Sequence, residues 1–177
     1  MNCPRLIAVL IACSTLAACA QQLPPNPYTA ACSAAPANFN VTKVADTPTP
    51  AAPPPGKALV YVIESVINYP FITKKVNLAV DGAWIGATDA NTHLSFIVDP
   101  GPHHLCAVYQ GHAASMDDEG HTLLLHLNAQ AGHTYYLRYH ALFLKDSPGI
   151  ALFDLVDEDE GLFLFQHTES AKVTLKK

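Results

Sequence analysis

Histidine is the residue type in this chain with the greatest capacity for metal or proton chemistry, and all nine histidines lie between residues 93 and 167. Imidazole is a common ligand of zinc and of other transition metals. A site built from neighbouring residues would need a spacing such as His-x-His or His-x₃-His, and neither occurs. His103 and His104 are adjacent, so on a strand their side chains point to opposite faces. The sequence therefore predicts no metal site and no cofactor.

Motifs of catalysis are missing from the sequence as well. It contains no Gly-x-Ser-x-Gly turn, no glycine-rich phosphate loop and no His-Glu-x-x-His. The acidic runs at 117–119 and 157–160 lack the alternating ligand spacing of a calcium loop. We expect the first to be a solvated loop and the second to start a helix. The chain is predicted not to be an enzyme.

The elements that position the histidines and acidic residues are predicted to be strands, because short runs rich in Val, Ile, Leu and Tyr alternate with turn residues. Asp81-Gly82 predicts a two-residue hairpin turn, and Asp157-x-x-Glu160 predicts the cap of one short helix through about His167. The fold class expected is an all-β antiparallel sandwich of about seven or eight short strands with this C-terminal helix. The strands are expected at 58–67, 76–80, 83–87, 94–98, 103–109, 121–129, 133–143 and 150–156.

Two further turns, Asp99–Pro102 and Gln130–Gly132, are interpreted as hairpins. The first of these hairpins would place Cys106 opposite Ser95. Isolated histidines near the ends of the strands, such as His93, are expected to be solvated.

The third predicted hairpin supplies the candidate binding site. If residues 129 and 133 pair, Leu123, Leu125 and Leu127 face Tyr139, Leu137 and Tyr135 on the core side. The other side then gathers a mixed polar and aromatic surface, which is either a binding face or the solvated side of the sandwich. Its residues are His126, Tyr136, Arg138 and His140, with His126 directly opposite Tyr136.

Three segments resemble the DUF2846 family of bacterial lipoproteins, and also PEGA-type β-modules. They are Val76–Gly86, Val98–Leu105 and Ala131–Arg138, within a similarity that covers about residues 57–167. The resemblance implies a β-sandwich and a location in the cell envelope, and it implies no activity. Relatives place an arginine soon after the first Val-Tyr-Val strand, where this chain has Ile63 and Glu64, so that arginine's role cannot be carried over.

The N-terminus resembles the export signal of a bacterial lipoprotein. Arg5 precedes an apolar run that is too short to span a bilayer but suits a signal peptide. The sequence Leu16-Ala17-Ala18-Cys19 then resembles a lipobox, which implies removal of residues 1–18 and lipidation of Cys19. Ala20 follows the cysteine, which by resemblance to Gram-negative sorting implies the outer membrane, facing the periplasm.

Residues 19–56 are predicted to be a disordered tether that follows the lipidated cysteine. They hold nine of the fourteen prolines and few charged residues, so they lack the apolar surface needed to offset the entropy of ordering. The remaining residues, 57–177, form the predicted sandwich domain.

Cys32 and Cys106 are the two cysteines left beyond the lipobox, in a compartment that permits disulfides. A bond between them would close a loop of about 75 residues and contribute about 4–5 kcal/mol in the chain-entropy model. Two free thiols are the alternative, and the sequence leaves both open.

Charge and location together limit the partners. The net charge is −5, or −6 without residues 1–18, which hold one arginine and no acid. Phosphate recognition needs clustered Lys and Arg, so no nucleic acid is expected as a partner. We expect a membrane-anchored, non-catalytic sandwich that binds or braces an envelope protein or the cell wall. The alternative is a periplasmic small-ligand or metal-binding protein that uses the His-rich half.

Overall fold

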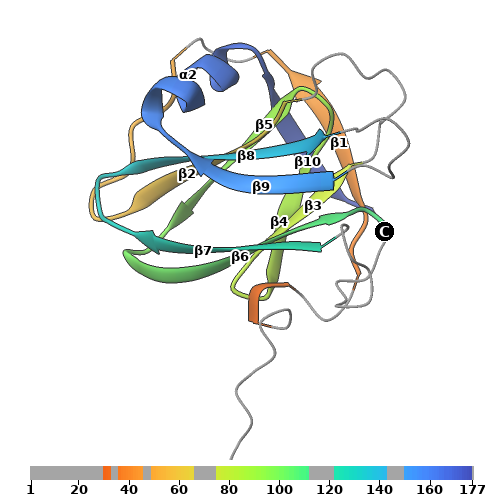
Figure 1. Ribbon diagram of the computed structural model, residues 1–177, viewed down its shortest axis with the longest axis horizontal. Helices are drawn as coiled ribbons and strands as arrows, with labels where there is room; N and C mark the ends of the chain where they lie inside the picture. Colours follow the sequence, from red (N-terminus) through yellow and green to blue (C-terminus); the bar gives the residue numbers. More distant parts are fainter. Residues whose placement is uncertain are drawn as a thin grey trace, which may run out of the picture.

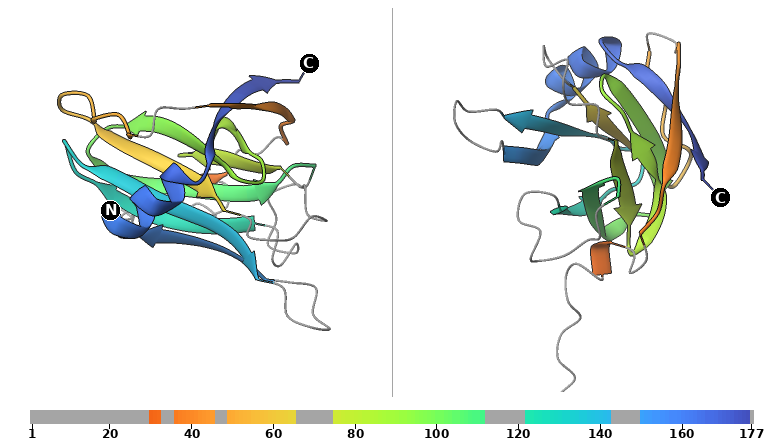
Figure 2. Two further views of the ribbon diagram at one scale, coloured as in Figure 1. Left: turned by 90° about the horizontal axis from the view of Figure 1, so that it is seen from above. Right: turned by 90° about the vertical axis from the view of Figure 1, so that its right-hand side faces the viewer.

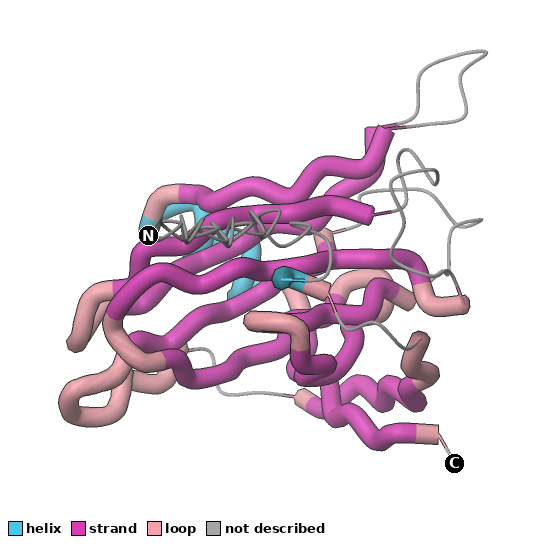
Figure 3. Tube along the Cα trace, turned by 90° about the horizontal axis from the view of Figure 1, so that it is seen from below, coloured by secondary structure: helices cyan, strands magenta, loops and turns pink. Residues whose placement is uncertain are grey.

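The computed structural model describes residues 30–32, 36–45, 49–65, 75–111, 122–142 and 150–176, and strands make up most of them (Figure 3). The predicted all-β sandwich with one short C-terminal helix is confirmed. It has ten described strands rather than seven or eight, and it is not wholly antiparallel, because the strands at 58–64 and 134–142, and those at 92–98 and 169–175, pair in parallel. Within these ranges, no helix is long and apolar enough to cross a membrane. The elements are β1 (Phe39–Val44), β2 (Ala58–Glu64), β3 (Val76–Val80), β4 (Ala83–Thr88), β5 (Thr92–Val98), β6 (Gly101–Tyr109), β7 (Thr122–Ala129), β8 (Thr134–Leu142), β9 (Ile150–Val156), α2 (Glu158–Gln166) and β10 (Glu169–Leu175).

Two sheets pack face to face, as the side views show (Figure 2). The six-stranded sheet has the order β1-β10-β5-β2-β8-β9, and the four-stranded sheet has the order β4-β3-β6-β7. Alternate side chains of each strand point between the layers, where burying them removes apolar surface from water. The most buried members of this core include Val60, Val62, Val76, Leu78, Leu105, Ala107, Leu127 and Leu137.

Two predicted hairpins are wrong, because their turns carry the chain from one sheet to the other. β5 pairs with β2 and β10, whereas β6 pairs with β3 and β7. Cys106 therefore lies opposite Ala79 and Leu124 rather than Ser95. In the same way β7 pairs only with β6, and β8 pairs with β2 and β9. The leucines of β7 and the Leu137 side of β8 do share the core, but they meet across the two layers.

The Asp81-Gly82 turn is the predicted hairpin that holds. Asp81 and Gly82 have φ values of 49° and 79°, the positive angles that a type I′ turn needs at both positions. Val80 pairs with Ala83 as expected, but the register shifts between Leu78 and Ala79. Beyond this irregularity Leu78 pairs with Gly86, one residue later than simple alternation predicts.

The sandwich begins before residue 57, which corrects the prediction of a spacer through residue 56. β1 lies inside that segment and pairs antiparallel with β10 along its whole length. The Phe39 side chain is buried, and this burial together with the backbone ladder offsets the cost of ordering a segment of low apolar content. β10, which follows α2, was not predicted either, and the two strands together form one edge of the six-stranded sheet (Figure 1).

Candidate functional site

The predicted binding face does not exist as one surface. His126 lies on the four-stranded sheet, opposite His104 of β6. Tyr136, Arg138 and His140 lie on β8 of the six-stranded sheet, on the side away from the core. The alternation of side chains predicted the core side of each strand correctly. A single binding face, however, required β7 and β8 to be neighbours in one sheet. Because β7 and β8 are in different layers, the two halves of the predicted face point away from each other.

The β8 half of the predicted face is covered by α2. The Tyr136 side chain is buried and stacks on Tyr61, with ring centroids 5.6 Å apart. Phe165 of α2 meets Tyr61 edge-on at 5.2 Å. Gly161 allows the helix to approach this closely, because a Cβ atom there would lie 2.2 Å from Cγ of Tyr136. Tyr136 is therefore part of the support for α2.

His93 belongs to the same cluster, which corrects the expectation that it is solvated. It is buried, its ring lies 4.4 Å from that of Phe165, and its Nδ1 is 2.9 Å from the Thr168 hydroxyl. The helix itself starts as predicted, since the Asp157 side chain accepts a hydrogen bond from the Glu160 N–H.

Arg138 and His140 connect β8 to β9 and α2. Arg138 forms ion pairs with Glu160 of α2 and with Asp154 of β9, the latter at 3.5 Å. Nδ1 of His140 lies 3.7 Å from the same Asp154 carboxylate. Burial, and next the charge of Arg138, hold the pKa of His140 below its ordinary value. The Arg138 ion pairs therefore connect β8 to both β9 and α2.

His103, on β6 of the four-stranded sheet, is a charged histidine. Nδ1 of His103 is 2.7 Å from the Asp81 carboxylate, and its Nε2 is 2.7 Å from the Asp99 carbonyl oxygen. Both partners are acceptors, so both ring nitrogens must donate and the imidazole carries a positive charge. Partial burial opposes this charge, but these hydrogen bonds outweigh it and raise the pKa of His103. The same Asp81 carboxylate accepts the His104 N–H at 2.8 Å.

Cys32 and Cys106 form a disulfide, with their Cα atoms 5.3 Å apart. Both are buried in a small cluster with Ala31 and Ala79, against which Trp84 and Leu124 also pack. The Gly82 N–H donates to the Ala31 carbonyl at 3.2 Å. Residues 30–32 therefore cover the outer side of the four-stranded sheet, where Figure 1 shows them in orange beside the lower layer.

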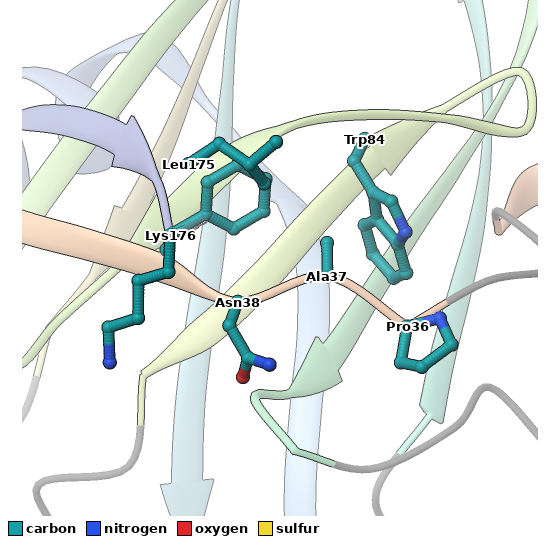
Figure 4. Close-up of a pocket in the computed structure, with 7 residues that line it drawn as sticks. Pro36, Ala37, Asn38, Trp84, Leu175 and Lys176 are labelled. Atoms are coloured by element: carbon teal, nitrogen blue, oxygen red, sulfur yellow. The ribbon is translucent and has the colours of Figure 1, made fainter.

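A groove of about 860 Å³ opens where the edge strands β1 and β4 meet the end of β10. In Figure 4, Trp84 and Pro36 stand at one end, Leu175 and Lys176 stand at the other, and the Asn38 amide projects between them. The groove is lined by Pro36, Ala37, Asn38, Phe39, Trp84, Leu175 and Lys176.

Hydrogen bonds from three directions hold the backbone of this groove in place. The Asn77 side-chain amide donates to the Ala37 carbonyl at 2.6 Å, and the Lys176 N–H donates to the Asn38 carbonyl at 2.8 Å. The Phe39 N–H donates to the Gln110 side chain at 2.8 Å. A groove held in this way loses little entropy when it binds a ligand. None of these lining residues was singled out from the sequence, because they come from separate parts of the chain.

Glu64 is a carboxyl group buried between the sheets at the end of β2, only 3% exposed. Its Oε2 has no hydrogen-bond partner among the described residues. Burial raises the pKa of Glu64 to about 8, with a smaller increase from Asp89, while Thr88 and Lys43 act in the opposite direction. At neutral pH this group is therefore mostly a neutral acid. Glu64 therefore lowers the stability of the fold at high pH.

Cys19 and the predicted signal peptide at residues 1–18 lie outside the described residues. No protein-family model, no curated protein and no solved structure matches the chain. Membership in the DUF2846 family therefore stays a prediction.

Proposed function

We propose that this protein is a bacterial lipoprotein, anchored through Cys19, whose β-sandwich binds another envelope component without catalysis. The proposed location is the outer membrane, facing the periplasm. The lipobox-like sequence at residues 16–19 supports the anchor. The roles of the described charged groups support the absence of catalysis, since Arg138 and His103 are both engaged in ion pairs within the fold.

The groove beside β1 and β4 is the observation that carries the binding role. Its backbone is held by hydrogen bonds, and an apolar side chain is exposed at its rim, where Leu175 is 64% exposed. β1 and β4 are the edge strands of their sheets, and such edges offer backbone groups to an added strand. The partner that fits best is an extended peptide segment of an envelope protein. Its apolar side chains would contact Trp84 and Leu175.

Site-directed photocrosslinking in cells that produce the full chain tests this role. A photoreactive residue in place of Leu175 is expected to give a discrete crosslinked product with an envelope protein. The matched control is Ile97, which is also an exposed apolar residue but lies on β5, away from the groove. Equal crosslinking from both positions, or none from position 175, would contradict the proposed surface.

A small molecule is the second candidate occupant, because the groove volume lies within the range of about 300–1,000 Å³ typical of ligand sites. In that case position 175 would give no protein crosslink. Instead, a compound screen by thermal shift should find ligands whose effect is lost in Trp84→Ala.

The anchor is tested separately by Cys19→Ala in the full chain. The variant is expected to remain uncleaved or to fractionate away from the membrane, whereas the wild type fractionates with it. Identical processing and fractionation of the two proteins would show that Cys19 is not lipidated.

A further inference from the structure

Two histidines that are 22 positions apart in the sequence lie side by side on the outer face of the four-stranded sheet. His104 of β6 and His126 of β7 are directly opposite each other in the antiparallel pairing. Their ring centroids are 5.2 Å apart, and the ring planes are inclined by 62°. Both residues are exposed to solvent.

The ring nitrogens of this pair are available, unlike those of the other well-placed histidines. His93, His103, His133 and His167 each place a ring nitrogen within hydrogen-bond distance of an oxygen. Within the described ranges, neither His104 nor His126 makes a side-chain hydrogen bond. Neutral imidazole nitrogens that face water are in the state needed to bind a metal ion.

The separation of the rings suits two ligands of one ion. A divalent metal binds imidazole nitrogen at about 2.0–2.1 Å, and two such rings at a tetrahedral angle have centroids roughly 5 Å apart. The observed 5.2 Å agrees with this distance.

The backbone beneath the pair is held in place. On one side of His104, its N–H donates to the Asp81 carboxylate, and its carbonyl accepts the Asp81 N–H, both at 2.8 Å. On the same strand and the same face, Cys106 is tied by the disulfide. Folding therefore already fixes the backbone that carries the two imidazoles. This lowers the entropy lost when both rings bind one ion, which favours chelation.

We propose that His104 and His126 form a site for a late first-row divalent metal ion, bound through two imidazoles with water in the remaining positions. No third histidine, cysteine or carboxylate completes a cluster with them in the described chain. The Asp81 carboxylate is already occupied by His103 and the His104 N–H. The order of divalent-ion affinities for nitrogen ligands predicts that Cu²⁺ binds more tightly than Ni²⁺ or Zn²⁺. This site is separate from the groove and does not depend on the lipid anchor.

Titration of the full chain with Cu²⁺ and with Zn²⁺ tests the proposal. Free thiols are first alkylated and the protein is stripped with a chelator, so that the remaining cysteines do not contribute. One ion per chain is expected, and the Cu²⁺ electron paramagnetic resonance spectrum should show coupling to two nitrogens.

Variants locate the ion. His104→Ala and His126→Ala should each lower the affinity by at least about tenfold, because one imidazole alone loses the benefit of the second. His133→Ala and His167→Ala, which remove exposed histidines elsewhere, should bind as the wild type does. His126→Gln serves as a second variant if an alanine change disturbs folding, which circular dichroism without metal would reveal. Unchanged affinity in folded His104 and His126 variants, or no binding by the wild type, would overturn the proposal.

Discussion

The two outer faces of the sandwich are covered in different ways. On the six-stranded sheet, α2 lies over an apolar cluster that includes Tyr61, Tyr136 and Phe165. On the four-stranded sheet, residues 30–32 lie over a small cluster, and the Cys32–Cys106 disulfide attaches them. The first cover is a short stretch of chain that follows β9 directly, whereas the second comes from a position 74 residues away in sequence.

This difference shows how the area of contact decides what is needed to hold a cover. A helix that buries several aromatic and aliphatic side chains is stabilised by roughly 25 cal/mol per Å² of apolar surface. The small cluster around Cys32 and Cys106 buries much less apolar surface, so packing offsets less of the loss of conformational freedom there. A covalent bond replaces the missing area, because it limits the freedom of the unfolded chain.

Loss of the disulfide is expected to have the largest effect. The double change Cys32→Ala with Cys106→Ala should lower the free energy of unfolding by about 4 kcal/mol, as the chain-entropy model gives for a loop of this length. Urea unfolding under non-reducing conditions measures the change. Chemical reduction of the wild-type protein should give the same midpoint as the double variant. A loss below about 1 kcal/mol would mean that packing alone holds residues 30–32.

Gly161→Ala tests the other cover by forcing the helix away from the sheet. Alanine usually stabilises a helix relative to glycine by up to about 1 kcal/mol. Here its Cβ would lie 2.2 Å from Tyr136 Cγ, so we expect a loss of about 3 kcal/mol, the upper part of the range for overpacking. Thermal unfolding and the near-ultraviolet spectrum of the tyrosines would report it. Gln166→Ala, an exposed position on the same helix, should be nearly neutral, and a stabilised Gly161→Ala protein would show that the contact is not close.

Glu64→Gln tests the core between the two sheets, which lies beneath both covered faces. The folded-state pKa of Glu64 is raised from 4.5 to about 8. A raised carboxyl pKa means that the folded protein binds the proton more tightly, so stability is greatest at low pH and falls as the pH rises from about 4.5 to 8. The glutamine variant should remove this fall, so at pH 6 it should already be more stable than the wild type by about 2 kcal/mol. Glu158→Gln on the exposed side of α2 is the control, and parallel pH profiles for the wild type and Glu64→Gln would exclude a raised pKa.

Arg138→Ala should have the smallest effect. Its two ion pairs are partly exposed, so their loss should cost about 1 kcal/mol and less at high salt. A double-mutant cycle with Glu160→Ala measures the coupling to α2. Zero coupling at low salt would mean that aromatic packing alone holds the helix.

The sequence predicted what depends on local patterns. Alternation identified the core side of β7 and β8, the Asp81-Gly82 pair identified a turn, and Asp157 identified the start of α2. Strand pairing was not predictable in this way, because a strand in a sandwich points its apolar residues at the core in either sheet. The turn at Gln130–Gly132 therefore fits a hairpin and a crossing between layers equally well.

The candidate site was harder to predict than the fold for the same reason. His126 was assigned to a site with residues of β8, but its actual neighbour is His104, which only the β6–β7 pairing places beside it. The groove depends on β1, a strand of six residues that lies within the proline-rich segment. Phe39 and Val41 alternate with Asn40 and Thr42, a strand pattern that is short, and nothing in it specifies pairing with the last strand of the chain.

The disulfide also limits how far the sandwich can stand from a membrane. If Cys19 carries the lipid, the free length of chain runs only from residue 19 to residue 32, which spans at most about 45 Å when fully extended. Without the bond, the next point held to the sandwich would be Ala37, whose carbonyl accepts the Asn77 amide, and the limit would rise to about 60 Å. The oxidised sandwich would therefore stay closer to the membrane than the reduced one. The volume in which it can meet a partner would be smaller as a result.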